Sequence, residues 1–267
     1  MAYATNEGVR IYYEEEGPPD AETVVFVEGL AYGTWMWNWQ RKPLAGKYHT
    51  VVLDNRGTGE SDTPAGPYTV GEMAADVEAV LAAAGVDAAH VVGASLGGMI
   101  AQEYALSYQR AQSLALFCTT PGGDEAMPIP EETQARMLNV PEGYGPTETV
   151  RYKMQPAFTD EFRENHPEVV DRIVEWRLDT DPTEEAYEWQ SAAAAAFDAS
   201  DRLSEIAVPT LVAHGTADRV LPVENAHLLA EGIPGAELVT VEGGSHLFFI
   251  ERDEQVTGEL RGFLADV

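Results

Sequence analysis

Residues 90–98 read His-Val-Val-Gly-Ala-Ser-Leu-Gly-Gly, a short apolar run that leads directly into a G-x-S-x-G pattern. The apolar run predicts a strand, and the segment from Leu96 to about Tyr108 predicts a helix. Small residues between a strand and a helix permit a sharp, strained turn that presents one side chain. A bare G-x-S-x-G occurs often by chance, but the strand before it, the helix after it and the extra Gly98 single out Ser95 as a nucleophile.

Short apolar strands alternate with helical segments on both sides of this turn. Strands are expected at residues 9–15, 23–27, 49–53, 90–93, 114–117, 210–213 and 237–241, and helices at 68–84, 96–108, 223–231 and 253–265. This alternation requires a mostly parallel sheet with helices on both faces. From Pro121 to about Ser200 the strand pattern stops, and aromatic and charged residues recur at helical spacing. We therefore expect an α/β core formed by residues 1–120 and 201–267, with a helical lid inserted at residues 121–200.

A serine hydroxyl needs a base to attack an ester at neutral pH, and the base needs a group that fixes its tautomer. Asp218 follows a predicted strand by a short turn, and His246 follows the last predicted strand in a glycine-rich loop. With Ser95, all three candidates therefore follow the carboxyl ends of strands. Their order along the chain, Ser, Asp, His, differs from that of the two well-known protease folds. The alternatives are that Asp218 is a surface acid beside Arg219 and that His246 merely caps a strand.

These segments together resemble the α/β-hydrolase superfamily over nearly the whole chain. Residues 54–61, Asp-Asn-Arg-Gly-Thr-Gly-Glu-Ser, are similar to the family's D-x-R-G-x-G-x-S turn. Residues 214–218, His-Gly-Thr-Ala-Asp, resemble the segment that carries the acid, and residues 246–251 match the stretch that carries the histidine. The resemblance is greatest to small, lidded carboxylesterases, enol-lactonases, C–C bond hydrolases and cofactor-free haloperoxidases. It implies an α/β-hydrolase fold with a mostly parallel sheet of about eight strands.

The resemblance also implies an oxyanion hole made of two backbone N–H groups, that of Leu96 and, by position, that of Leu30. The sequence departs from the family at Glu28, because many members carry histidine there. We expect Glu28 to form an inert ion pair, with Arg56 as the candidate partner. The alternative is a buried carboxyl group with a raised pKa that influences substrate choice.

Serine at position 95 argues against haloalkane dehalogenase and epoxide hydrolase chemistry, which need a carboxylate nucleophile. Attack by Ser95, with His246 taking its proton, leads instead to an acyl-enzyme that water then hydrolyses. The expected substrates are small, fairly apolar carboxylic esters or lactones. A haloperoxidase or perhydrolase, a C–C bond hydrolase with the same triad, and a small-molecule receptor on a hydrolase scaffold are the alternatives.

Three apolar residues near the predicted site are candidates for substrate contact, although each could equally be core packing: Trp35, Met99 and Phe248. His214 lies one turn before Asp218 and is interpreted as structural. The other histidines show no ligand spacing with one another or with Cys118, so we expect neither a metal site nor a cofactor.

The chain is strongly acidic: 45 Asp and Glu against 16 Lys and Arg give a formal net charge of -29. Such a surface is repelled by phosphates, so nucleic acid is excluded as a partner. Lysine is scarce, with only Lys42, Lys47 and Lys153, and the acidic residues are dispersed. This composition is typical of proteins from salt-accumulating halophiles, and an ordinary acidic enzyme is the alternative.

The sequence lacks the features that mark secreted and membrane proteins. With Cys118 as its one cysteine, the chain can form no internal disulfide. Residues 1–16 lack the charged start and apolar stretch of a signal peptide, and no run approaches the length of a membrane span. We expect a cytoplasmic protein whose partners are a small substrate and water, with no membrane contact. Oligomeric state has no signature in the sequence.

Overall fold

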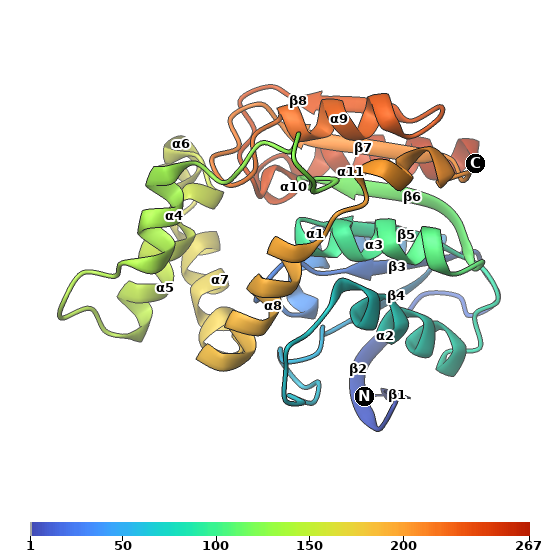
Figure 1. Cartoon of the computed structure of the whole chain (residues 1–267), viewed down its shortest axis with the longest axis horizontal. Coiled ribbons are helices and arrows are strands. Elements are labelled where there is room, and N and C mark those ends of the chain that lie inside the picture. The colour runs from blue at the N-terminus through green and yellow to red at the C-terminus, as the bar shows by residue number, and fades with distance from the viewer. Residues whose placement is uncertain (1) are drawn as a thin grey trace.

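The computed structural model describes residues 2–267. Its centre is an eight-stranded sheet with the order β1-β2-β4-β3-β5-β6-β7-β8 (Figure 1). The strands are β1 (Ala2–Asn6), β2 (Val9–Glu16), β3 (Thr23–Val27), β4 (His49–Leu53), β5 (Ala89–Ala94), β6 (Ala111–Phe117), β7 (Thr210–Gly215) and β8 (Glu237–Val241). β1 pairs with β2, and β2 with β4, in antiparallel fashion. The six strands from β3 to β8 run parallel to one another. The predicted mostly parallel sheet of about eight strands is confirmed.

The central strands are apolar because helices cover both faces of the sheet. β3, β4, β5 and β7 are buried at every residue, as expected of parallel strands, whose sequences are continuous apolar runs. Successive side chains of a strand point to opposite faces. Val25 and Val27 accordingly belong to one core cluster, and Val24 and Phe26 to the other.

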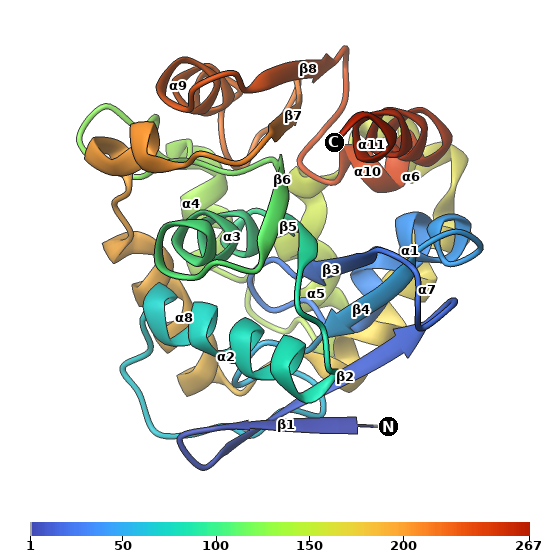
Figure 2. The same ribbon diagram turned by 90° about the vertical axis from the view of Figure 1, so that its right-hand side faces the viewer.

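Helices pack on both faces of the sheet, as Figure 2 shows. α2 (Val70–Ala83), α3 (Leu96–Ser107) and α9 (Glu224–Gly232) lie on one side, and α1 (Asn38–Leu44), α10 (Phe248–Glu251) and α11 (Asp253–Asp266) on the other. A 3-10 turn, η1 (Thr34–Trp37), leads into α1. The sequence pattern did not predict α1, which is only seven residues long and contains Pro43.

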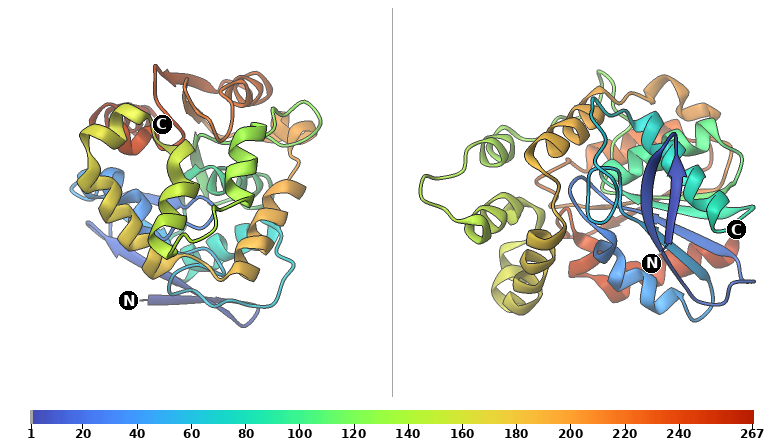
Figure 3. Two further views of the ribbon diagram at one scale, coloured as in Figure 1. Left: turned by 90° about the vertical axis from the view of Figure 1, so that its left-hand side faces the viewer. Right: turned by 90° about the horizontal axis from the view of Figure 1, so that it is seen from below.

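Residues between β6 and β7 form a cluster of short helices over one end of the sheet (Figure 1; Figure 3, left, in yellow-green to orange). They are α4 (Glu131–Leu138), α5 (Pro146–Met154), η2 (Gln155–Ala157), α6 (Asp160–Asn165), α7 (Pro167–Thr180) and α8 (Glu184–Ala196), followed by η3 (Ser200–Glu205). Proline in the first turn starts α5 and α7, and the threonine side chains Thr159 and Thr183 cap α6 and α8. The helices expected in residues 121–200 are therefore present, and we call this segment the lid.

Candidate active site

The parallel strands end at one edge of the sheet, and the loops that follow them carry every predicted catalytic residue. Val27 of β3 pairs with Gly93 of β5, and Gly93 pairs in turn with Leu116 of β6. The loops that follow these strands, among them the one with Ser95, therefore start side by side at the same edge of the sheet. This is the edge at which open α/β sheets bind ligands.

Ser95 lies on a strained turn between β5 and α3. Its backbone has φ 55° and ψ −118°, which is unusual for a residue other than glycine. Glycine is required beside it, since a Cβ atom on Gly97 would lie 2.1 Å from the carbonyl oxygen of Val27, and one on Gly93 2.2 Å from that of Gly97. Ser95 is partly exposed, whereas the residues on either side of it are buried. The turn thus presents the Ser95 side chain to the ligand edge of the sheet.

Asp218 is a fully satisfied buried carboxylate. Its Oδ1 accepts hydrogen bonds from the backbone N–H groups of Val220 (2.7 Å) and Leu221 (3.0 Å). Its Oδ2 accepts from His246 Nδ1 (2.7 Å) and His214 Nε2 (3.1 Å). Burial alone would raise the pKa of Asp218, but the two histidines lower it to about 2. Asp218 is therefore ionised at neutral pH and accepts hydrogen bonds without donating any.

The ionised carboxylate fixes which ring nitrogen of His246 faces it with a proton. Because Asp218 can only accept, His246 Nδ1 carries a proton, so in the neutral imidazole Nε2 holds the lone pair that a base needs. His214 cannot act as this base, since its Nε2 donates to Asp218 and to the carbonyl oxygen of Leu221 (2.9 Å), and its other ring nitrogen, Nδ1, belongs to a completely buried side chain that a substrate cannot reach. Its interpretation as a structural residue agrees with this geometry.

Ser95 and His246 are brought to the same edge, but no hydrogen bond joins their side chains in residues 2–267. The strand between the serine turn and the loop of Asp218 is β6: the N–H of Ser95 donates to the carbonyl oxygen of Phe117 (2.9 Å), and the N–H of Cys118, the residue after β6, donates to that of Ala213 in β7 (3.0 Å). The serine turn and the end of β7, which leads to Asp218, therefore lie on either side of the end of β6. A serine–histidine contact is often loose until substrate is bound.

The loop that carries His246 is anchored to the lid. Ser245 Oγ donates to the carbonyl oxygen of Ala157 (2.6 Å), and the N–H of Leu247 donates to the same oxygen (3.0 Å). Glu251 accepts from the N–H of Ser245 (3.0 Å) and from that of Thr159 (2.6 Å). Lid residues 157–159 therefore hold the histidine loop from one side.

The two predicted oxyanion donors have no protein partner. Within residues 2–267, neither the N–H of Leu30 nor that of Leu96 donates to another group of the chain. Leu96 is the first residue of α3, where backbone N–H groups lack acceptors inside the helix and attract negative charge. Leu30 is followed by Ala31, whose φ of 65° turns the chain sharply. Both amides are chemically suited to bind an oxyanion.

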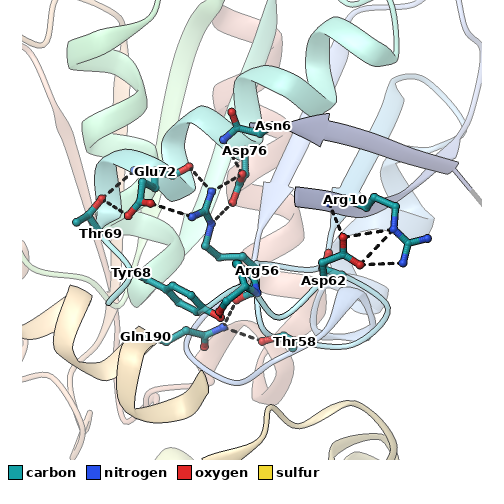
Figure 4. A network of polar contacts seen from close by, with 12 residues as sticks. Asn6, Arg10, Arg56, Thr58, Asp62, Tyr68, Thr69, Glu72, Asp76 and Gln190 are labelled. Carbon is teal, nitrogen blue, oxygen red and sulfur yellow. Dashed lines mark hydrogen bonds and ion pairs between the residues drawn. The ribbon is translucent and has the colours of Figure 1, made fainter. Parts of the chain in front are cut away.

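The expected ion pair between Glu28 and Arg56 is wrong. Arg56 instead binds Asp76, at 2.7 and 2.9 Å, and Glu72, at 3.2 Å (Figure 4). Glu28 is completely buried, and neither of its carboxyl oxygens has a partner in the described chain. Burial, and after it the charge of Asp54, raises the pKa of Glu28 well above its usual value. The buried carboxyl group, given above as the alternative, is what the structure contains.

The three candidate substrate contacts are mostly buried. Trp35 stacks on Trp176 of the lid, with ring centroids 5.4 Å apart, and donates from Nε1 to Thr180 Oγ1 (3.0 Å). Phe248 has no exposed surface and packs against Phe117 and Phe249. Met99, in the first turn of α3, keeps 6% of its surface exposed. Their contact with substrate stays a prediction.

Two lid residues that the sequence pattern did not predict, Gln190 and Thr180, bind the loop after β3. Gln190 accepts a hydrogen bond from the N–H of Ala31 (3.1 Å), a residue 159 positions earlier. Thr180 receives the Trp35 hydrogen bond described above. Neither lies in a motif, and no local signal in the sequence connects a lid helix to a loop so distant in the chain.

No grouping of three or more His, Cys, Asp or Glu side chains suited to a metal ion is found between residues 2 and 267. No helix in that range is long and apolar enough to cross a membrane.

Comparison with known proteins gives consistent similarities over the full length. The RutD protein of Azorhizobium caulinodans, named as a candidate carbamate hydrolase, is 30% identical over 268 residues, covering 100% of this chain and 99% of that protein. Among solved structures, Est816, an N-acyl homoserine lactone degrading enzyme, has 33% identity and a TM-score of 0.85 over 98% of this chain and 100% of its own. The enol-lactonase from Burkholderia xenovorans LB400 has 28% identity and a TM-score of 0.87 over 99% and 100%. The family model described as alpha/beta hydrolase fold matches residues 22–253, so this chain belongs to the α/β-hydrolase fold family.

Proposed function

We propose that this α/β hydrolase is a serine hydrolase that cleaves small, fairly apolar carboxylic esters or lactones through an acyl-enzyme. The observation that carries the proposal is the 2.7 Å hydrogen bond from His246 Nδ1 to the ionised Asp218, at the sheet edge where the strained turn presents Ser95. A nucleophile, an oriented base and a buried acid are the three parts that acyl transfer needs.

The reaction follows from these roles. Ser95 Oγ attacks the substrate carbonyl carbon while His246 Nε2 takes its proton, and Asp218 stabilises the resulting imidazolium. The N–H groups of Leu30 and Leu96 bind the oxyanion of the tetrahedral intermediate. His246 then gives its proton to the leaving alkoxide as the acyl-enzyme forms. Water activated by His246 hydrolyses the acyl-enzyme and restores Ser95.

The substrate class rests on the relatives and on the chemistry of the site. The names of two similar solved structures denote lactone cleavage, and others in the family are esterases. A lactone is an internal ester, so the same residues act on it, and its alkoxide leaving group stays attached to the acyl chain. We place lactones beside simple esters as candidate substrates. If the protein cleaves neither esters nor lactones, a haloperoxidase, a C–C bond hydrolase or a small-molecule receptor would replace the proposed function.

The test is hydrolysis of p-nitrophenyl esters of rising chain length and of acyl homoserine lactones and unsubstituted lactones. The wild type is expected to turn over short esters or lactones, and Ser95→Ala is expected to lower kcat roughly 10⁴-fold or more. Ser107→Ala, at the exposed end of the same helix, is the matched control and should keep wild-type activity. A folded wild type without turnover on either panel would overturn the proposal, as would an equally active Ser95→Ala.

A further inference from the structure

The loop after β3, residues 28–35, supplies one predicted oxyanion donor but has few bonds of its own. The N–H of Gly29 donates only to the thioether sulfur of Met36 (3.3 Å), and the turn between Tyr32 N–H and the Gly29 carbonyl oxygen is long, at 3.3 Å. Ala31 lies at φ 65°, a conformation that non-glycine residues keep only when the surroundings enforce it. The loop therefore needs support from outside.

That support comes from Gln190 of lid helix α8, which is fully buried. Its Oε1 accepts from the N–H of Ala31 (3.1 Å), while its Nε2 donates to the carbonyl oxygen of Arg56 (2.8 Å) and to Thr58 Oγ1 (2.8 Å), as Figure 4 shows for the last two residues. The orientation of the amide is fixed, because the opposite one would set N–H against N–H at Ala31 and oxygen against oxygen at Arg56. The Gln190 side chain thus links the lid to the turn at residues 54–61 and to the loop at residues 28–35.

The Ala31 amide belongs to the peptide that directly follows Leu30. The Leu30 N–H lies in the preceding peptide, whose Gly29 carbonyl oxygen accepts from the N–H of Tyr32 (3.3 Å). The two peptides are linked through the φ and ψ angles of Leu30, so holding the Ala31 amide restricts those angles and with them the direction of the Leu30 N–H. Thr180 and Arg177 of α7 support the next residues: Thr180 accepts from Trp35, and the Arg177 guanidinium lies 5.0 Å from the Tyr32 ring centre. From outside the lid, Asn55 Nδ2 donates to the carbonyl oxygen of Glu28 (3.0 Å), and Asp54 Oδ1 accepts from the N–H of Thr34 (2.8 Å). Among the lid residues that the structure describes, Gln190 is the one whose side chain bonds the loop backbone, at the amide that follows Leu30.

We propose that Gln190 is a positioning residue, through which the lid holds the Leu30 N–H in place to receive the oxyanion. The inference rests on the proposed serine hydrolase function. It gives the lid a part in the chemical step as well as in admitting substrate, because a displaced lid would release the loop. A displacement of about 1 Å at such a donor lowers the rate of the chemical step roughly a hundredfold.

The test compares Gln190→Met, which keeps side-chain volume and removes all three hydrogen bonds, with the wild type. We expect kcat to fall roughly tenfold to a hundredfold with little change in KM. Affinity for a boronic acid, which forms a tetrahedral adduct on the serine, should fall by a similar factor, because it depends on the same donor. Hydrogen exchange in a peptide covering residues 28–36 should become faster.

The control is Thr183→Ala, which removes the N-cap of the same helix without touching the loop. It should lower thermal stability and leave kcat, boronic acid affinity and exchange in residues 28–36 within about twofold of the wild type. Should Gln190→Met be too unstable to purify, Thr58→Val, which removes one of the three partners, is expected to change the same quantities in the same direction by a few fold.

The outcomes separate the two proposals. An active wild type with unchanged kcat and boronic acid affinity in Gln190→Met would overturn the role of Gln190 and leave the serine hydrolase proposal standing. A loss confined to KM, or one matched by Thr183→Ala, would also overturn it. A wild type that neither turns over esters and lactones nor binds the boronic acid would overturn the proposed function, and the role of Gln190 with it.

Discussion

Glu28, the residue after β3, carries a completely buried carboxyl group whose oxygens have no hydrogen-bond partner in the described chain. Arg56, the partner expected from the sequence, binds Asp76 of α2 instead. Asp54 is a charged neighbour of Glu28. Burial also raises the pKa of Asp54 to about 6, although Asp54 accepts hydrogen bonds from two backbone N–H groups. Two carboxyl groups are therefore buried together.

This environment predicts a stability that falls with pH. In the unfolded chain Glu28 ionises near its ordinary pKa of 4.5, whereas in the folded chain it stays protonated to a higher pH. The contribution of protonated Glu28 is complete below that ordinary pKa and is lost as pH rises toward the folded pKa, by up to about 1.4 kcal/mol per pH unit. Glu28→Gln removes the ionisable group and should flatten the dependence, raising stability at about pH 8 relative to the wild type.

The measurement is urea unfolding of both proteins at about pH 5 and about pH 8, with Asp87→Asn, a fully exposed carboxylate, as control. Equal slopes of unfolding free energy against pH in wild type and Glu28→Gln would show that Glu28 is ionised in the folded protein.

The predicted catalytic residues differ from Glu28 because their signals are local. Ser95 is marked by the glycines of its own turn, and Asp218 and His246 by the short loops that follow strands. Gln190 has no such mark, because its proposed role depends on a contact between segments 159 residues apart. Local motifs therefore predicted the candidate triad, while the residue proposed to position the oxyanion donor could be found only in the structure.

At the scale of elements, the turn between β5 and α3 depends on close approach of backbone to backbone. Gly97→Ala would bring a Cβ within 2.1 Å of the Val27 oxygen and 2.6 Å of the Glu28 oxygen, and a backbone group cannot move aside as a flexible side chain can. We expect this substitution to destabilise the protein by at least about 3 kcal/mol.

Gly262→Ala is the matched control for the same chemical change. Gly262 lies in α11 with open space around its Cβ position, so alanine should stabilise the protein by about 0.5–1 kcal/mol. Thermal unfolding of both variants checks the pair. A Gly97→Ala variant as stable as the wild type would mean that the turn is less tightly packed than described.

The alternation of strands and helices predicted the sheet well because parallel strands buried on both faces have continuous apolar sequences. Elements without such a pattern were harder to predict. α1 contains a proline, and the lid helices are short, with boundaries set by caps and prolines. The arrangement of the lid over the strand ends depends on contacts such as that of Ser245 with Ala157, which no periodicity encodes.

At the scale of the whole molecule, a formal charge of -29 on 267 residues implies strong self-repulsion. Salt screens such repulsion, because the Debye length shrinks from about 10 Å at 0.1 M to about 3 Å at 1 M. We therefore expect the melting temperature to rise between about 0.1 M and 1 M KCl, by about 2–4 °C for each kcal/mol of repulsion relieved.

Sucrose serves as the uncharged control for the salt series, since it stabilises proteins by exclusion and does not screen charge. A melting temperature that does not change with KCl would contradict the halophilic interpretation. It would not bear on the proposed serine hydrolase function.

We expect Ser95 to be a nucleophile that His246 activates, and covalent labelling measures this reactivity itself. The wild type, Ser95→Ala and His246→Ala would be treated with a fluorophosphonate, which phosphonylates activated serines, and followed by intact-protein mass. We expect one adduct per chain, mapped to Ser95, absent from Ser95→Ala and formed far more slowly in His246→Ala. An unlabelled wild type, or a label that persists in Ser95→Ala, would contradict it.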